Sequence, residues 1–409
     1  MFREVRGFGI PVVTGVLSSR RRVALLLGSS VERVAFDLLD ALGRAVPPEQ
    51  AREAPCRQTV IRPPFDIRNI LPVPTHTELD AGPFITAGLV RARDPETGEA
   101  DVTIHRIGVQ GPDRLSIYFV PGRRIDLFRA KAERAGRALP VSVSIGLDPA
   151  IYLAACVGPP AAPAGVDELS IAGGIRRRPV KLADCVSVDE MAIANAEIVI
   201  EGEILPAVRI SEDAHTGKGY SMPEFHGYMG IAEPEVPVMQ VTAITHRRNP
   251  IFQAIIGPAQ DRAQLVGIPA EAGTIRAAGA IAPGLLSSAY AHEAGAGSLL
   301  CVLQVSKTGP EDDERSRTMA LACFDHFRQL RAVALVDDDV NIFDPQDLLW
   351  AMATRCEGPA GLVFSTGLPL RFLGGSSRTI VDATVPWSQR QRLRRVRFAP
   401  VDTSRFSAS

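Results

Sequence analysis

The chain has 409 residues, of which 46% are hydrophobic and 22% charged, and its formal net charge at pH 7 is -1. This length predicts two or three domains with ordinary buried cores, and the near-zero charge argues against nucleic acid as the main partner. The six cysteines are scattered singly, so they indicate neither a zinc site nor a disulfide framework but reduced, mostly buried thiols.

The sequence is expected to belong to a soluble, cytoplasmic protein. Its first residues, MFREVRGFGIP, have neither the apolar region nor the cleavage site of a signal peptide. No apolar run approaches the roughly 18 residues that a membrane span needs. We therefore expect no membrane association.

Residues 1–70 are predicted to form a small α/β segment. Ser29 and Glu32 stand at capping-box spacing, and apolar residues follow them at helical spacing from Val31 to Leu42. The stretch at residues 45–74 is rich in proline and arginine and is predicted to be a connector.

Residues 71–250 are predicted to form a domain of short strands. A helix near residues 125–134, ended by Gly136, interrupts them. Many short strands with one or two helices favour a β-barrel or a bent sheet. The early strands are predicted at residues 84–91, 101–109, 114–119 and 141–145.

A further strand is predicted at AEIVIEGEI, residues 196–204. Glu197, Glu201 and Glu203 fall on one face of it, because side chains alternate along a strand. We expect these acids to face water and the isoleucines to face the core.

Residues 251–409 are predicted to form an α/β domain, because apolar runs alternate with helical stretches. Four acids at 311–314 open a helix that extends to Leu330. Asp344 and Pro345 are predicted to be the N-cap and first residue of a helix that ends at Arg355. The apolar runs lie at residues 298–305, 331–336 and 361–365.

An acidic triplet, Asp337, Asp338 and Asp339, follows the second of these runs. Three adjacent acids can hold a metal, but at a strand-to-helix turn they more often have a structural role. We predict the structural role.

Several stretches resemble the signature of one known family. VPTHTELDAGPFIT occupies residues 73–86, and AEIVIEG at 196–202 is followed by a loop and then by PEFHGY at 223–228. They resemble the UbiD family of decarboxylases, whose usual pattern is a run like AEIVLEG, then EGPxGE or EGPxGD, then a Gly-Tyr pair. The resemblance extends from about residue 5 to 390 of this sequence. It implies a central split β-barrel that binds prenylated FMN, and a C-terminal α/β domain that pairs subunits in a homodimer or higher homo-oligomer.

The resemblance also implies a catalytic arginine and a proton donor. Arg106, in DVTIHR at residues 101–106, falls where the family has its catalytic arginine, and a planar guanidinium suits a carboxylate. Glu224 falls at the family's proton donor. A carboxyl group beside another carboxylate and an apolar ligand is pushed toward the neutral form, which can donate a proton.

The second acid of the family has two candidate positions, because the loop is longer here. Counting forward from Glu197 places the acid at Glu212, whereas counting back from Glu224 places it at Gly219. We favour Glu212, with the loop folded out as an insertion.

The cofactor positions implied by the resemblance depart from the family pattern. Family members bind the flavin phosphate through a divalent metal held by Asn, His and Glu. The matching positions here hold Asp101, then Arg124 or Arg123, then Glu168. An arginine has no lone pair for a metal but can bind a phosphate directly. We therefore predict that arginine holds the phosphate. Asp101 and Glu168 remain as ligands for the family's Mn²⁺, but we expect the binding of both Mn²⁺ and K⁺ to be weak or absent.

The remaining implied cofactor contacts come from one strand and from the C-terminal domain. Arg378 falls where the family often has a lysine near the cofactor. The strand contributes Thr103, Ile104 and His105.

The resemblance therefore predicts a reversible, non-oxidative decarboxylase of an aromatic, heteroaromatic or α,β-unsaturated carboxylic acid, supplied with prenylated FMN by a flavin prenyltransferase. The absence of GxGxxG after a strand, of a P-loop and of GxSxG makes nucleoside-triphosphate and serine-hydrolase chemistry weak alternatives. The altered loop and metal positions leave a second hypothesis open, a non-catalytic paralogue that holds a flavin or serves as a structural subunit of a larger complex.

Overall fold

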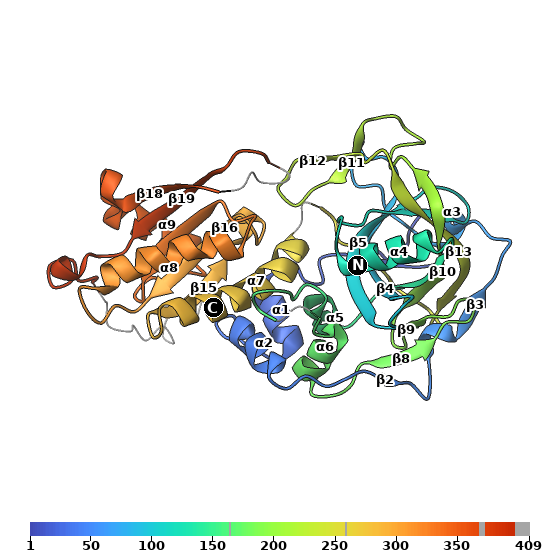
Figure 1. Cartoon of the computed structure of the whole chain (residues 1–409), viewed down its shortest axis with the longest axis horizontal. Helices are drawn as coiled ribbons and strands as arrows, with labels where there is room; N and C mark the ends of the chain where they lie inside the picture. The colour runs from blue at the N-terminus through green and yellow to red at the C-terminus, as the bar shows by residue number, and fades with distance from the viewer. Residues whose placement is uncertain (163–164, 258–259, 368–372, 397–409) are drawn as a thin grey trace, which may run out of the picture. The chain divides into compact units, whose positions relative to one another are not determined.

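The computed structural model describes residues 1–162, 165–257, 260–367 and 373–396 (Figure 1). The chain divides into two compact units, Met1–Ala277 with Ala291–Cys301, and Ala278–Tyr290 with Val302–Ser409. Within the described ranges, no helix has the length and apolar character needed to cross a membrane. All six cysteines are free thiols, as expected.

The first unit is built on a closed antiparallel β-barrel, which confirms the predicted barrel. The strands follow the order β10-β7-β4-β5-β6-β13, and β13 pairs with β10 to close the ring. A short strand, β3, pairs with the C-terminal end of β13. The strands are β3 (Thr59–Ile61), β4 (Phe84–Arg93), β5 (Ala100–Val109), β6 (Arg114–Ile117), β7 (Leu139–Ile145), β10 (Ile198–Ile210) and β13 (Val236–His246).

Alternating side chains give the barrel two buried faces. Ile198 and Ile200 of β10 pack in the barrel core with Val143 of β7, whereas Val199 packs in a second core with the surrounding helices. This division follows from the period of two along a strand. Since both faces are covered, polar side chains on the strands are buried too, among them Ser142, Ser144 and Glu201.

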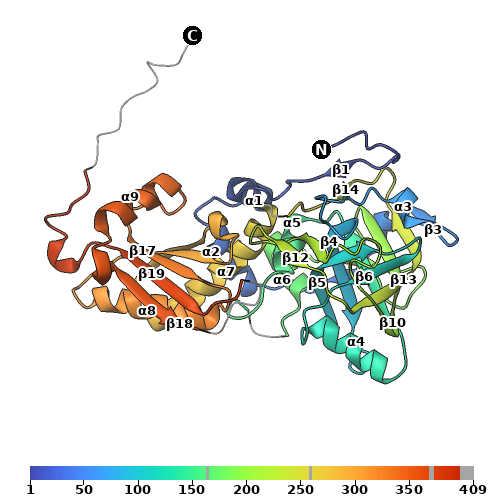
Figure 2. The same cartoon turned by 90° about the horizontal axis from the view of Figure 1, so that it is seen from above.

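Helices cover the outer face of the barrel and one of its ends. Tyr152 of α5 is fully buried in the outer core, and its hydroxyl donates to the carbonyl of Ala87 at 2.9 Å. Helix α4 contacts β4, β5, β7 and β10 (Figure 2). The helices are α1 (Arg20–Leu27), α2 (Val34–Leu42), α3 (Ile67–Ile70), α4 (Arg124–Arg134), α5 (Pro149–Ala154), α6 (Glu168–Arg176) and α7 (Gln260–Ile281), the last of which begins in this unit.

Three small sheets complete the first unit. Residues 45–74, predicted to be a connector, in fact contribute β2, α3 and β3 to the fold. The prediction was wrong because prolines are tolerated beside such short edge strands. The sheets are β1 (Val12–Val13) with β14 (Phe252–Gln253), β2 (Glu49–Gln50) with β8 (Lys181–Asp184) and β9 (Met191–Ile193), and β11 (Tyr220–Pro223) with β12 (Met229–Ile231).

Two local expectations are wrong. Helix α2 begins at Val34 without a side-chain cap, and Ser29 instead donates to the Asp37 carboxylate at 2.5 Å. Glu201 does not face water: it is 1% exposed, because Ser187 donates to its carboxylate from both its backbone N–H and its hydroxyl. A covering segment thus satisfies a buried acid that the strand pattern alone would place in solvent.

The second unit is an α/β layer, as predicted. Its sheet has the order β15-β16-β17-β19-β18, with β17 and β19 parallel and β18 antiparallel. Helices α8 (Asp312–His326) and α9 (Pro345–Arg355) lie on opposite faces of this sheet (Figure 2). Asp344 caps α9 by accepting from the N–H of Gln346 at 2.9 Å, as predicted. The strands are β15 (Leu286–Ala291), β16 (Leu300–Val305), β17 (Ala332–Asp337), β18 (Leu362–Thr366) and β19 (Ser377–Ala383).

Closure of the barrel requires a glycine at position 202. The β10–β13 register shifts between Glu201 and Gly202, and a Cβ at Gly202 would collide with the backbone oxygen of Gln240. We predict that Gly202→Ala lowers the free energy of unfolding by about 1–3 kcal/mol or more, measured by urea denaturation. Gly9→Ala, whose added Cβ meets nothing within 4 Å, should leave stability unchanged. Equal stability of the two variants would contradict the close approach of Gly202 to the Gln240 backbone.

Candidate active site

A cavity of about 280 Å³ lies in the first unit. Its volume is close to the lower end of small-molecule sites, about 300–1,000 Å³. Most of its wall is apolar, from residues such as Ile104, Ile255 and Leu265, and a few charged side chains enter it. Such a combination of apolar wall and convergent polar groups is typical of a ligand site.

Arg106 and Glu212 form a bidentate ion pair at this cavity. The guanidinium donates from Nε to Glu212 Oε1 at 2.8 Å and from Nη2 to Oε2 at 2.7 Å. The Glu212 side chain is 1% exposed and also accepts from the N–H of Glu233 at 2.9 Å. Two parallel charge-assisted hydrogen bonds fix the plane of the guanidinium.

Glu224 binds the remaining edge of the same guanidinium. Its Oε1 accepts from Arg106 Nη1 at 2.5 Å, and its backbone N–H donates to the Tyr228 carbonyl at 2.8 Å, at the turn that joins β11 to β12. A Cβ at Gly230 would come within 2.9 Å of Glu224 Cγ, so the glycine leaves room for the acid. The structure thus brings together the arginine and the two acids that the sequence singled out.

The long loop between the two acids folds on itself as an insertion. Asp213 accepts through its carboxylate from the N–H of Gly219 at 2.8 Å and through its carbonyl from the N–H of Gly217 at 2.8 Å. The loop therefore closes within a few residues of where it opens. Glu212, and not Gly219, is the residue that contacts Arg106.

The arginine keeps its charge in this setting. Burial by itself lowers the pKa of Arg106, but the charges of Glu212 and Glu224 outweigh burial and raise the pKa above the ordinary arginine value. The ring of Tyr118 lies against the guanidinium, with 4.2 Å between Cζ and the ring centre. One cation between two carboxylates leaves the cluster with a net negative charge, which favours the uptake of a proton. A bound anion can also replace one of the two carboxylates on the arginine.

A second charged group lies where β5 begins and α4 starts. Arg124 contacts Asp101 at 3.2 Å between Nη1 and Oδ1 and Glu99 at 2.6 Å between Nη2 and Oε1. Burial raises the pKa of Asp101 to about 6 although Arg124 opposes the shift. Burial and the charge of Asp101 raise the pKa of Glu168 to about 8, and one oxygen of Glu168 is buried without a partner. Arg123, the N-cap of α4, is exposed.

These residues do not fit a divalent metal. Among the described residues, no group of three His, Cys, Asp or Glu side chains is placed to hold an ion. Asp101 is already paired with Arg124, whose guanidinium cannot be a ligand. The exposed Arg123 and the partly exposed Arg124 fit an anionic phosphate better than a cation.

The strand β5 carries the remaining predicted cofactor contacts in this unit. Ile104 and His105 line the cavity, and Thr103 precedes them on the strand. Nε2 of His105 is buried without a hydrogen-bond partner, and burial lowers the pKa of this histidine to about 4. A neutral ring nitrogen without a hydrogen-bond partner at a cavity wall fits a ligand that forms this hydrogen bond. Together with the apolar wall, His105 therefore fits an aromatic cofactor.

Arg378 belongs to the second unit, where its guanidinium is engaged. It donates to the carbonyls of Phe324 and Leu330, both at 3.1 Å, and to that of Arg328. These bonds hold β19 against the end of α8. The cofactor contact expected of Arg378 remains a prediction.

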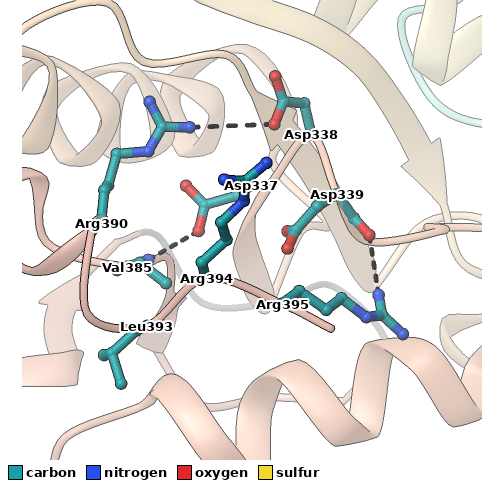
Figure 3. A pocket seen from close by; sticks show the side chains of 8 residues that line it. All are labelled: Asp337, Asp338, Asp339, Val385, Arg390, Leu393, Arg394 and Arg395. Atoms are coloured by element: carbon teal, nitrogen blue, oxygen red, sulfur yellow. Dashed lines mark hydrogen bonds and ion pairs between the residues drawn. The ribbon is translucent and has the colours of Figure 1, made fainter. Parts of the chain in front are cut away.

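The acidic triplet of the second unit lies among arginines, and Figure 3 shows Arg390 near Asp338 and Arg395 at the backbone carbonyl of Asp339. Asp339 makes a bidentate pair with Arg355 at 2.8 and 2.7 Å. Asp337 accepts from the N–H of Val385 at 2.7 Å, and Asp338 lies 4.0 Å from Arg390. Such contacts fit the structural role expected of the triplet.

Two residues at the site escaped the sequence analysis. Gln110 donates through its amide to the Glu212 carbonyl at 3.1 Å, and Arg262 lines the cavity near Glu224. Neither residue falls in a motif. The one signal for Arg262 is a cation in the first turn of a helix, where the helix dipole disfavours positive charge.

Comparisons with known proteins agree on one family. Residues 49–259 match the 3-octaprenyl-4-hydroxybenzoate carboxy-lyase Rift-related domain, and residues 263–383 match the C-terminal domain of the same carboxy-lyase. A gallate decarboxylase of Lactiplantibacillus plantarum is 39% identical over 98% of this chain and 86% of its own.

Solved structures give the same result. The 3,4-dihydroxybenzoic acid decarboxylase of Klebsiella pneumoniae is 44% identical with a TM-score of 0.94, covering 99% of this chain and 88% of its own. The UbiD-class enzyme HmfF of Pelotomaculum thermopropionicum, in complex with prFMN, is 34% identical with a TM-score of 0.86, covering 98% of this chain and 87% of its own.

The buried, neutral His105 predicts a pH dependence of stability. An unfolded histidine takes up a proton near pH 6.5, whereas the folded His105 does so near pH 4. The unfolded state therefore binds more protons in this window, and the stability present above about pH 6.5 is lost as the pH falls.

We expect the wild type to lose about 2 kcal/mol more than His105→Gln between pH 7 and pH 5, measured by chemical denaturation. The exposed His326 provides the control, since His326→Gln should follow the wild type. Parallel pH profiles for wild type and His105→Gln would show that His105 is not buried in its neutral form.

Proposed function

The chain belongs to the UbiD family of carboxy-lyases, and we propose that it catalyses the non-oxidative decarboxylation of an aromatic carboxylic acid with prenylated FMN as its cofactor. One observation carries the proposal above the others. Arg106 is held by Glu212 and Glu224 at the wall of an apolar cavity, which is the arrangement of a carboxylate-binding cation with a proton donor beside it.

The substrate class follows from the cavity and the relatives. Its apolar wall suits a flat ring, and two of the similar proteins are decarboxylases of gallate and of 3,4-dihydroxybenzoic acid. We propose a hydroxylated benzoic acid as the substrate. Heteroaromatic and α,β-unsaturated acids remain within the predicted class.

The proposed cofactor has support in both the residues and the relatives. HmfF has been solved in complex with prFMN, and the unpaired His105 Nε2 and the apolar side chains here fit a flavin ring. Ile104 and His105 would line the ring, and Arg123 and Arg124 would hold the phosphate. When bound, the prenylated flavin supplies an electron-accepting group next to the reacting carbon.

The chain's own residues bind the substrate and move one proton. Arg106 Nη1 binds the substrate carboxylate in place of Glu224. Two negative charges then lie side by side, and this favours uptake of one proton by the pair. The apolar wall excludes water from the ring and strengthens these contacts.

The reaction then breaks one carbon–carbon bond and forms one carbon–hydrogen bond. The bond between the ring carbon and the carboxylate breaks, its electron pair remains on the ring side, and carbon dioxide leaves. The Glu224 carboxyl donates its proton to that carbon and regains one from solvent. Glu212 holds the plane of Arg106 throughout. The reverse sequence carboxylates the ring when carbon dioxide is abundant.

The catalytic hypothesis is better supported than the alternative of a non-catalytic paralogue. That alternative depended on the altered loop and on the altered metal positions, and only the metal positions still favour it. The loop folds outward and leaves Glu212 on Arg106, and the chain belongs to a family of carboxy-lyases.

Assembly and location also remain proposals. The HmfF structure in complex with prFMN is of an evolved dimeric form. For this chain we propose a homodimer or a higher homo-oligomer. We further propose that it acts in the cytoplasm, where a flavin prenyltransferase supplies its cofactor.

We predict that Arg106→Lys lowers kcat/KM by about 100- to 1,000-fold. A lysine keeps the charge but loses the planar fork, so the buried Glu212 retains a counter-ion and the fold is preserved. Arg106→Ala should abolish turnover, but it also leaves Glu212 buried without a partner, which by itself destabilises the protein.

The measurement is carbon dioxide release from hydroxylated benzoic acids by protein co-expressed with a flavin prenyltransferase. Arg114→Ala changes an exposed arginine on β6 and should retain full activity. A folded, flavin-loaded Arg106→Lys enzyme with wild-type turnover would contradict the assigned role.

A further prediction concerns the phosphate site. Because Arg124 already pairs with Asp101, we expect no stoichiometric divalent ion in flavin-loaded protein, measured by elemental analysis. Arg124→Met should weaken flavin binding by about 10- to 100-fold, with the exposed Arg137→Met as control. A tightly held Mn²⁺ that is lost in Asp101→Asn or Glu168→Gln would contradict the metal-free site.

A further inference from the structure

Arg262 is a second cation at the wall of the same cavity. It lies in the first turn of α7 and lines the cavity together with Arg106 and Glu224. Its guanidinium packs on the ring of Phe225, with 3.9 Å between Cζ and the ring centre. The stacking holds the side chain in place without consuming its hydrogen-bond donors in the plane.

The charge of Arg262 has far less compensation than that of Arg106. In the described ranges, no carboxylate forms an ion pair with Arg262, and its one hydrogen bond runs from Nη1 to the Ala296 carbonyl at 3.2 Å. A guanidinium has five N–H donors. Burial lowers the pKa of Arg262 to about 10, whereas the pKa of Arg106 is raised.

A cation held out of water without a counter-ion is costly, and its persistence at a cavity points to a partner that arrives with the ligand. Glu224 lies nearby and its charge acts on Arg262 without an ion pair, and the other wall residues beside Arg262 are apolar, namely Ile255, Leu265 and Val266. The partner must therefore be an acidic oxygen of the bound molecule.

We propose that Arg262 binds a second acidic oxygen of the substrate ring, a phenolic oxygen or a second carboxylate, and so selects acids that carry one. This inference rests on the proposed function, in which Arg106 takes the reacting carboxylate. Each cation then has its own oxygen acceptor on the substrate, and the apolar wall between them accommodates the ring. An acid without the second oxygen leaves Arg262 desolvated and unpaired, which opposes its binding.

The direct test is ligand binding by FMN-loaded protein, measured by isothermal titration calorimetry with three probes: 3,4-dihydroxybenzoate, terephthalate and benzoate. The wild type should bind at least one of the two substituted acids about 10- to 100-fold more tightly than benzoate. Tighter binding of 3,4-dihydroxybenzoate identifies a phenolic oxygen as the partner, and tighter binding of terephthalate identifies a carboxylate.

Arg262→Met, which keeps the length of the side chain without its charge, should lose this preference and bind all three probes with the affinity of benzoate. The exposed Arg114→Met should behave as the wild type. Equal weakening of all three probes, or loss of FMN in Arg262→Met, would overturn the proposal, because Arg262 would then serve the reacting carboxylate, the flavin or the fold.

Kinetics separate this role from catalysis. In enzyme loaded with prenylated FMN, Arg262→Met should raise KM for the preferred acid by about 10- to 100-fold and leave kcat within about 5-fold, as expected for loss of a binding contact. A fall in kcat with unchanged KM would overturn the proposal. If the wild type releases no carbon dioxide from 3,4-dihydroxybenzoate or any other hydroxylated benzoic acid, the proposed substrate class fails, whereas the calorimetric preference still reports on Arg262.

Discussion

The site depends on the double pairing of β10. This strand hydrogen-bonds to β7 along one edge and to β13 along the other, and the second pairing closes the barrel. The β10–β13 ladder continues beyond the strand, because Glu212 N donates to the Glu233 carbonyl at 3.0 Å and Glu233 N donates back to the Glu212 carboxylate. Glu212 is thus fixed by the barrel itself. Arg106, on β5, is placed by the same ring of strands, so the closed barrel holds both members of the ion pair.

The charged groups at the cavity and at the start of α4 are either paired with a counter-ion or left without one. Arg106 is compensated by two carboxylates, and Asp101 is compensated by Arg124. Arg262 and the orphaned oxygen of Glu168 have no such partner among the described residues. Uncompensated groups of this kind mark where a ligand or a proton binds, because burying them alone is costly.

Local signals in the sequence predicted local structure well. Asp344 and Pro345 predicted the start of α9, and short strand-like runs predicted strands of the barrel. The predictions failed where side-chain contacts competed with the local pattern. Ser29 binds Asp37, eight residues away, in place of capping a helix. Glu201 is buried because residues 186–187 cross over it, which depends on where another part of the chain lies.

The pattern of short strands indicated a barrel or a bent sheet, and the family signature favoured the barrel. The sequence by itself also indicated the α/β unit and the candidacy of Arg106 and Glu224, because such patterns are written in neighbouring residues. Only the tertiary structure identified Glu212 and not Gly219 as the second acid. An insertion makes counting along the chain ambiguous, but it does not change the hydrogen bond that holds Glu212 beside Glu233. The same holds for Arg262, which lies 156 positions after Arg106 in the sequence and lines one cavity with it. Ion pairing and burial depend on distance in space, and folding alone brings such distant side chains together.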